Sequence, residues 1–298
     1  MKYKIEKNTV QETLIIPLYA RKVCSELYPN LYQDETAVRL INEIDYDFSD
    51  ADKNARSLMQ RFGSLEVAMR QNDLAWEVRD YLKTHPNAAV VNLGCGLDST
   101  GRSCDNGSCK IYNLDFPDVI AVRDELLPAG EREENIPCDL NNTEWFRKID
   151  SSNGAVFFAS GVFYYFLTEQ VKALVQGMAD AFPGGVLVFD AANRTAVKMI
   201  AKTWLKSAKI KDVGAYFAVS DAPKEIGAWD SRLQVTSRGY MLGYPAAVCG
   251  YWLTHGRWHG GKERWKRCVA HTAAPKSPPS TRRGSGSGKA PPSRLPVR

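Results

Sequence analysis

The sequence predicts an α/β fold built on a doubly wound, mostly parallel sheet, and three observations lead to this prediction. Short apolar segments alternate with helical ones from residue 88 onward. The first of these segments ends in two glycines one residue apart, Gly94 and Gly96. An acidic residue, Asp115 or Asp139, ends each of the next two. Strands that are apolar on both faces and separated by helices are typical of parallel sheets covered by helices on both sides.

The strands and helices of this domain are predicted one by one along the chain. Strands are predicted over residues 88–94, 109–115, 134–139, 155–161 and 185–191, which have the composition of buried strands. A last strand is predicted over residues 233–242. Helices are predicted over residues 117–127, 143–149, 168–182 and 195–209. The helix after residue 168 is the clearest, because its apolar residues form one stripe and Thr168 can cap its start.

The segment before the first strand is predicted to be a helical cap over residues 1–85. Between residues 53 and 85 apolar side chains recur at helical spacing, and Asp34 is placed to cap a neighbouring helix. The strand–helix domain then covers residues 86–244, and a segment of different composition occupies residues 245–298. The predicted organisation therefore has three parts.

The last segment carries all of the excess positive charge. Its net charge is +10 against +5 for the whole chain, so residues 1–244 carry −5. This distribution does not predict a nucleic-acid-binding protein. The Pro-, Ser-, Gly- and Arg-rich composition predicts a basic, largely disordered tail. We therefore expect the antiparallel strand that should follow Tyr244 to be missing or disrupted, and hypothesise a shifted reading frame or an unrelated fusion. The alternative is a natural basic tail that binds nucleic acid or an anionic membrane.

Composition also bounds the compartment and the metal content. Apolar runs are too short for a membrane-spanning helix or a secretory signal, and seven cysteines favour reduced thiols, so a cytoplasmic protein is predicted. Cys104 and Cys109 are close in sequence, but a zinc site takes four ligands and no second pair lies nearby. We expect no metal site.

The glycine turn in AVVNLGCGLDST, residues 89–100, predicts a nucleotide-binding loop, because glycine lets the backbone approach a ligand closely. A dinucleotide fingerprint needs a third glycine where this chain has Ser99. Asp115 can accept hydrogen bonds from ribose hydroxyls, a role shared by NAD and S-adenosylmethionine enzymes. An acid at Asp139 is more typical of the latter. A nicotinamide-dependent oxidoreductase stays as the alternative, as do a helix cap for Asp115 and a capped turn for Asp139.

Six blocks of the sequence resemble the leucine carboxyl methyltransferase family, and most of all its bacterial branch of O-methyltransferases often linked to polyketide biosynthesis. They are ETLIIPLYARK, EVAMRQND, VVNLGCGLDS, YNLDFPDV, IPCDL and SGVFYYFL. The similarity extends from about residue 12 to 244. It implies a Rossmann-like class I methyltransferase fold and S-adenosyl-L-methionine as the cofactor.

The resemblance also implies roles for individual residues. The loop around the methionine part of the cofactor would be shaped by Gly94, Gly96 and Asp98, the ribose held by Asp115, and the adenine faced by Asp139 and Leu140. Arg70 matches the family arginine that pairs with the cofactor carboxylate, a task suited to a guanidinium. Tyr19, Arg21 and Lys22 match an N-terminal segment that folds over the site. Ser160, also at the cofactor site, stands where family members commonly have glutamate.

The chemistry favours a carboxylate as the methyl acceptor. Methyl transfer is an in-line displacement that needs alignment, and a hydroxyl acceptor also needs a base. Among residues 1–244 the chain has one histidine, His85, which precedes the first strand and so lies opposite the site. A carboxylate is already ionised and needs no base. Candidate acceptor-positioning residues are Arg21, Lys22, Tyr164 and Tyr165. A non-catalytic cofactor-binding protein with a nucleic-acid-binding tail is the alternative outside enzymes.

Overall fold

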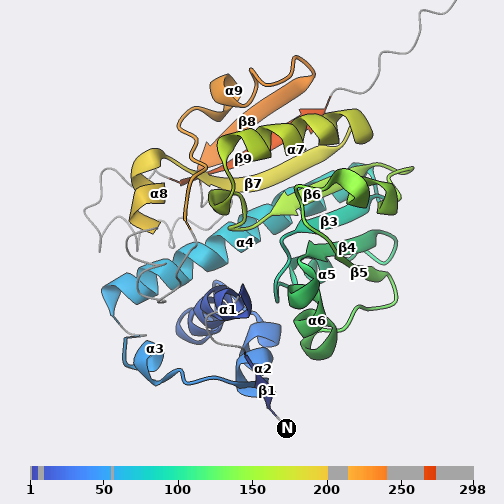
Figure 1. Ribbon diagram of the computed structural model, residues 1–298. Helices are drawn as coiled ribbons and strands as arrows, with labels where there is room; N and C mark the ends of the chain where they lie inside the picture. Colours follow the sequence, from blue (N-terminus) through green and yellow to red (C-terminus); the bar gives the residue numbers. More distant parts are fainter. Residues whose placement is uncertain (1, 6–9, 55–56, 201–213, 240–264, 273–298) are drawn as a thin grey trace, which may run out of the picture.

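The computed structural model describes residues 2–5, 10–54, 57–200, 214–239 and 265–272 of the chain (Figure 1). Its main feature is a seven-stranded sheet between two helical layers. The strands are β3 (Ala89–Leu93), β4 (Lys110–Asp115), β5 (Glu133–Pro137), β6 (Ala155–Ala159), β7 (Val186–Ala192), β8 (Leu233–Gly239) and β9 (Trp265–Thr272). They lie in the order β5-β4-β3-β6-β7-β9-β8, and every neighbouring pair is parallel except the two that involve β9. The predicted doubly wound sheet is confirmed.

The expectation of a missing or disrupted last strand is wrong, because β9 supplies that strand. It lies in the segment predicted to be a disordered tail, and it pairs antiparallel with both β7 and β8. Val269 and Ala270 are 3% exposed and pack on opposite faces of the sheet, against α4 (Leu58–Thr84) and α7 (Thr168–Ala181). The pattern was missed because lysine and arginine interrupt the strand and because it does not directly follow residue 244.

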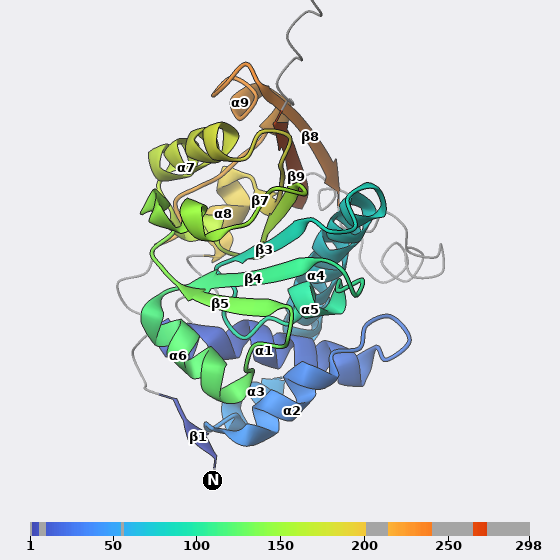
Figure 2. The same ribbon diagram turned by 90° about the vertical axis from the view of Figure 1, so that its right-hand side faces the viewer.

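Two helices cover the faces of the sheet, as Figures 1 and 2 show. The second half of α4 packs its Leu74, Val78 and Leu82 on one face of β3, β6 and β7. On the other face α7 contributes its apolar stripe, together with Trp145 of the 3-10 helix η1 (Thr143–Lys148). Side chains of the strands alternate between these layers, so both faces are buried and the parallel sheet is stable.

The helices predicted over residues 117–127, 143–149 and 168–182 are observed as α6 (Pro117–Leu126), η1 and α7, and α8 (Arg194–Ile200) begins the fourth predicted helix. Three short helices were not predicted, namely α5 (Thr100–Ser103), η2 (Phe163–Tyr165) and α9 (Ala222–Glu225). The rest of the helix predicted over residues 195–209 falls outside the described residues. Thr168 is the first residue of α7 and not its cap; the Gln170 side chain accepts from the Leu167 N–H at 2.8 Å instead.

The N-terminal elements form the predicted helical layer beside β5-β4-β3 (Figure 2). They are β1 (Tyr3–Lys4), α1 (Val10–Leu27), α2 (Glu35–Glu43), β2 (Ile44–Asp45) and α3 (Ser49–Asn54), and α1 lies against α2, α4 and α6. Asp34 caps α2 as predicted, accepting from the Ala37 N–H at 2.8 Å. Because half of α4 packs on the sheet, the predicted boundary at residue 85 separates the cap from the domain in sequence only.

Candidate cofactor and acceptor site

Gly94, Gly96 and Ser160 of the predicted site lie where the strand order reverses, in the loops after β3 and β6. From β3 the chain adds β4 and β5 on one side, and then crosses over from β5 to place β6 on the other side of β3. Ligands of open α/β sheets bind in the crevice outside such a switch point. The loops after β3 and β6 touch there: a Cβ on Gly94 would lie 2.6 Å from a methyl group of Val162.

Both glycines of the loop after β3 are required by their conformation. Gly94 has φ +65° and Gly96 has φ +46°, in the left-handed region that side chains rarely adopt. Val162 fills the space that a side chain at Gly94 would need, and Leu14 of α1 approaches within 3.1 Å of a Cβ on Gly96. The glycines therefore let the loop turn sharply between the β6 loop and the cap.

Asp115 lies at the end of β4 with its carboxylate fixed by two backbone donors. Oδ2 accepts from the Gly96 N–H and Oδ1 from the Phe116 N–H, each at 2.8 Å. Burial raises the pKa of this carboxyl above its usual range, although the two backbone hydrogen bonds oppose the rise. A carboxylate has about four lone-pair sites, so both oxygens can accept further hydrogen bonds. Sequence reasoning missed Phe116, the next residue, which is large, apolar and 41% exposed.

Asp98 is buried inside the loop and not aimed out of it. Its Oδ1 accepts from the N–H and the hydroxyl of Thr100, both at 2.7 Å, and from the amide of Gln71. Asn92 of β3 lies 3.4 Å from Oδ2. The carboxylate is thus used by the protein itself, so its effect on a ligand acts through the shape of the loop.

Arginines bind three consecutive carbonyls of the loop. Arg123 of α6 donates through Nη1 to the carbonyls of Gly96 and Asp98, at 2.9 and 2.8 Å. Arg21 of α1 donates through Nη2 to the Leu97 carbonyl at 3.0 Å. The first of these arginines was not found from sequence, although an arginine in an apolar helix segment is a usable signal.

Asp139 and Leu140 lie after β5 in different surroundings. Asp139 is exposed, and its Oδ1 accepts from the N–H and the side-chain amide of Asn141, both at 2.9 Å. This is the capped turn that the sequence left open. Leu140 is buried against Trp145 in the core. The loop is joined to the site through Cys138, whose N–H donates to the Asp115 carbonyl at 2.8 Å.

Arg70 of α4 lies at the ends of β6 and β7 and pairs with Asp190 of β7. Its Nη1 is 3.1 Å from Asp190 Oδ2, and Asp190 Oδ1 accepts from the Gly161 N–H at 2.7 Å. Gly161 has φ +74°, and its Cα faces the guanidinium closely, since a Cβ there would lie 3.0 Å from both Nη atoms. Ser160 precedes it in the same loop. Asp190 was missed, although an acid at the end of an apolar strand is a signal of the same kind as Asp115.

Glu66 lies one helical turn before Arg70 on α4 and completes this charged cluster. Burial raises the pKa of its carboxyl to about 8, and the charge of Asp190 contributes to the rise while Arg70 opposes it. Near neutral pH the group is therefore mainly protonated. A carboxyl held in this way can donate or take up a proton within the physiological range.

The four acceptor-positioning candidates do not form one cluster. Tyr164 is buried against α8, whereas the neighbouring Tyr165 is 43% exposed. Arg21 is committed to an ion pair with Asp34 at 2.9 Å, and Lys22 lies 3.1 Å from Glu26.

Tyr19 also folds into the cap, because its hydroxyl donates to Asp52 at 2.6 Å and its ring stacks on Phe48.

Both described histidines lie away from these strand ends. His85 ends α4 and stacks on Tyr81 with ring centroids 4.3 Å apart, beside Gly154 at the start of β6. His271 pairs in register with Val186, the first residue of β7. Backbone position thus puts both at the amino ends of the parallel strands, opposite the switch point.

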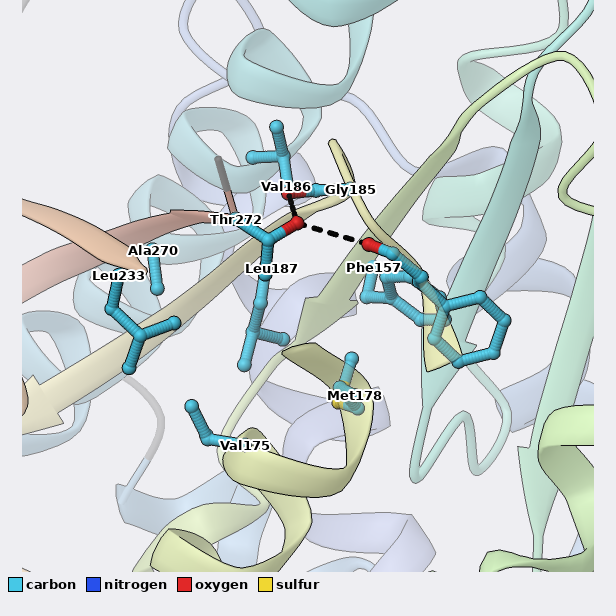
Figure 3. A pocket seen from close by; sticks show the side chains of 10 residues that line it. Phe157, Val175, Met178, Gly185, Val186, Leu187, Leu233, Ala270 and Thr272 are labelled. Atoms are coloured by element: carbon cyan, nitrogen blue, oxygen red, sulfur yellow. Dashed lines mark hydrogen bonds between the residues drawn. The ribbon is translucent and has the colours of Figure 1, made fainter. Parts of the chain in front are cut away.

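An apolar cavity of about 20 Å³ lies apart from the candidate site, between α7 and the strands β6 to β9 (Figure 3). Thr272 closes its edge by donating to the Phe182 and Gly185 carbonyls. The remaining lining is apolar, and the volume is that of about one water molecule. It is a packing defect beside β9 and not a ligand site.

Two further properties concern only the part of the chain that the structure describes. There, no group of three or more His, Cys, Asp or Glu side chains is arranged to hold a metal ion. No helix in the same ranges has the length and apolar composition needed to cross a bilayer.

Comparison with known proteins finds similarity to methyltransferases. The sequence model of the leucine carboxyl methyltransferase family matches residues 17–179. The tetracenomycin polyketide synthesis O-methyltransferase TcmP of Streptomyces glaucescens is 30% identical over 186 residues, which are 61% of this chain and 66% of that enzyme, just under two thirds of its length. The S-adenosyl-L-methionine-dependent methyltransferase dpfgK of Gibberella zeae is 26% identical over 85% of this chain and 89% of its own.

Two solved structures share the fold at low sequence identity. A methyltransferase candidate from Thermobifida fusca YX superposes with a TM-score of 0.54 at 16% identity, over 85% of this chain and 94% of that one. A DUF574 family protein from Streptomyces avermitilis MA-4680 gives a TM-score of 0.56 at 13% identity, over 85% and 97%. These likenesses concern the fold.

Proposed function

This chain belongs to the leucine carboxyl methyltransferase family, and we propose that it transfers a methyl group from S-adenosyl-L-methionine to an oxygen of a small molecule, namely a carboxylate. It is a class I methyltransferase in this proposal, with the crevice at the ends of β3, β4 and β6 as the cofactor site. The support from relatives is for methyl transfer, and none of it favours the nicotinamide-dependent oxidoreductase or the non-catalytic alternative.

The observation that carries the proposal is the position of Asp115. Its carboxylate is held by the Gly96 N–H at the switch point and keeps lone pairs for two ribose hydroxyls. Phe116 offers an exposed ring beside it for the adenine. The carboxylate acceptor and the aromatic side chain therefore fit the nucleoside part of the cofactor. Gly94, Gly96 and Asp98 would shape the loop for the methionine part, and Arg70 and Ser160 would lie near its carboxylate.

Asp139 and Leu140 have narrower roles in this proposal. The Asp139 carboxylate is exposed and engaged by its own turn, so it would face the adenine only from the rim. Leu140 would support the same wall from below, since it packs in the core. We expect the ribose contact to contribute more affinity than the adenine contact.

When bound, S-adenosylmethionine supplies a methyl carbon on a positively charged sulfur, which an oxygen nucleophile attacks in line. The protein has to align the two atoms and exclude water. Tyr165, 43% exposed beside the Arg70–Asp190 pair, would wall the acceptor side, whereas buried Tyr164 would only support it. Neither described histidine lies at the strand ends, which favours an acceptor that is already ionised.

The proposed compartment and organisation follow from the same features. We propose a cytoplasmic enzyme, because five described cysteines are free thiols, four of them buried, which fits a reducing compartment. The small-molecule acceptor is the expected partner. The three parts, residues 1–85, 86–244 and 245–298, stay as cap, cofactor-binding domain and terminal segment, with β9 as the piece of the last that completes the sheet.

Calorimetric titration tests the cofactor and a methyl-transfer screen tests the acceptor. We expect S-adenosylhomocysteine to bind and NAD not to bind; binding of NAD alone would overturn the proposal. With labelled S-adenosylmethionine and a set of small carboxylates and phenols, we expect label only in carboxylate products. A methyl ester releases its label as methanol on mild alkaline treatment, whereas a phenol ether keeps it, so base-stable product would contradict the carboxylate acceptor.

A further inference from the structure

Arg21 of the cap is buried, and its guanidinium bridges two groups. Nε pairs with Asp34 at 2.9 Å while Nη2 donates to the Leu97 carbonyl at 3.0 Å. The Arg21 side chain is 5% exposed and the Asp34 side chain is 9% exposed. A planar guanidinium can satisfy both partners at once, which an ammonium group on a single nitrogen cannot do in the same geometry. The charge of Arg21 is thus neutralised inside the protein and not presented to an incoming acceptor.

The carbonyl that Arg21 binds is the middle one of three consecutive carbonyls in the glycine loop. Those of Gly96 and Asp98 on either side are bound by Arg123. Arg123 comes from α6 on the sheet domain, whereas Arg21 comes from α1 in the cap. The loop is therefore held from the domain at two carbonyls and from the cap at one.

A second chain of polar contacts joins the same two regions. The Tyr32 hydroxyl lies within hydrogen-bond distance of both Asp34 Oδ2, at 3.2 Å, and Gln71 Oε1, at 3.1 Å. The Gln71 amide in turn donates to the Asp98 carboxylate. Tyr32, Gln71 and Asp98 are all buried. Asp34, at the start of α2, is thus linked to Leu97 through Arg21 and to Asp98 through Tyr32 and Gln71.

We propose that Arg21 is a positioning residue that holds the glycine loop in its cofactor-binding conformation by joining it to the cap. This inference rests on the proposed function, since it takes the loop to be the cofactor loop. In this inference Arg21 does not contact the methyl acceptor, so it is no longer a candidate acceptor-positioning residue. Loss of the arginine should therefore loosen the loop and weaken cofactor binding, with no need for a contact between Arg21 and either ligand.

The test uses two substitutions of Arg21 in the full chain. Arg21→Lys keeps the charge beside Asp34 but loses the simultaneous bond to Leu97, and Arg21→Met loses both. Arg39→Met is the matched control, because Arg39 lies on the same cap, pairs with Glu43 at the surface, and contacts the domain at the Leu126 carbonyl of α6, outside the glycine loop. Leu174→Ala, in buried α7 away from the loop, controls for lowered stability alone. The two measurements are affinity for S-adenosylhomocysteine and amide hydrogen exchange of residues 95–98.

We expect affinity to fall about tenfold or more in Arg21→Met and by an intermediate factor in Arg21→Lys, with faster exchange at residues 95–98 in both. Both controls should stay within twofold of wild type in affinity and exchange. A folded Arg21→Lys protein with wild-type affinity and exchange overturns the inference. If Arg21→Met does not fold, Arg21→Lys decides alone. If the wild-type protein does not bind S-adenosylhomocysteine, the proposed function fails, and the exchange measurement still decides whether Arg21 holds the loop.

Discussion

The two sides of the switch point are built from different kinds of contact. At β3 and β4, backbone groups of the glycine loop are bonded to buried neighbours, and Asp115 is fixed by N–H donors. At β6 and β7, the contacts are between ionisable side chains, with Arg70 and Asp190 paired and Glu66 beside them. The first arrangement suits a ligand of fixed shape. The charge of the second depends on the pH and on the ligand bound beside it.

The largest effect is expected from Gly94→Ala on the backbone-built side. Alanine at φ +65° is strained, and its methyl group would meet Val162, so we expect the free energy of unfolding to fall by about 3 kcal/mol. Gly107→Ala is the control, because Gly107 has φ +83° but nothing within 4 Å of a Cβ. It should lose only about 1 kcal/mol. Equal losses in urea unfolding would show that the contact with Val162 is unimportant.

The next effect concerns cofactor affinity and separates Asp115 from Asp139. Asp115→Ala should weaken binding of S-adenosylhomocysteine by about 1–3 kcal/mol, because ribose hydroxyls would lose their partner in a closed site. Asp139→Ala should cost less than about 0.5 kcal/mol, since that carboxylate is exposed. Calorimetry measures both. An unchanged affinity in Asp115→Ala would mean that this residue serves only the turn at the end of β4.

A smaller change in stability is expected from Val269→Ala in β9. Val269 is 3% exposed against α4, so removing two methyl groups should lower the free energy of unfolding by about 1–2 kcal/mol. Urea unfolding gives the value. If the substitution has no effect on the free energy of unfolding, residues 265–272 do not form part of the folded sheet in solution.

The remaining effect is a pH dependence from the charged side, measured as a change in the free energy of unfolding with pH. The folded pKa of Glu66, about 8, lies above the unfolded value near 4.5, so the folded state binds the additional proton. The contribution to stability is full below pH 4.5 and is lost as the pH rises through 8, with a slope of at most about 1.4 kcal/mol per pH unit. Unfolding of wild type and Glu66→Gln across pH 5–9 measures the difference. A Glu66→Gln protein with the wild-type pH profile would contradict this assignment.

The backbone-built side could be predicted from the sequence because its signals are local. The strands β3, β6 and β7 are nearly continuous apolar runs, and each strand from β3 to β7 lies within two residues of its predicted ends. The glycine pair and Asp115 stand directly at the ends of such strands. A nucleotide-binding loop follows from these positions alone, whereas the hydrogen-bond partners of each side chain do not.

The charged side could not be predicted because its contacts join distant parts of the chain. Arg70 and Asp190 are 120 residues apart. The sequence between β7 and β9 likewise does not indicate that these two strands pair. The contacts of Arg21, on the backbone-built side, could not be predicted for the same reason, since they involve Asp34 and a carbonyl 76 residues away. Burial of Tyr164 and exposure of Tyr165 likewise follow from packing against α8. The amino-acid composition of a segment does not indicate which distant residues it will contact.

The place of β9 between β7 and β8 has a consequence for synthesis of the protein. β8 leaves the ribosome before β9, and among the strands that the structure describes β9 is its one partner in the sheet. At translation rates of about 5–20 residues per second, residues 240–264 delay it by roughly 1–5 seconds. During that time the apolar edge of β7 is open to pairing with other chains. A nascent polypeptide halted in this interval should be a preferred client of chaperones and proteases.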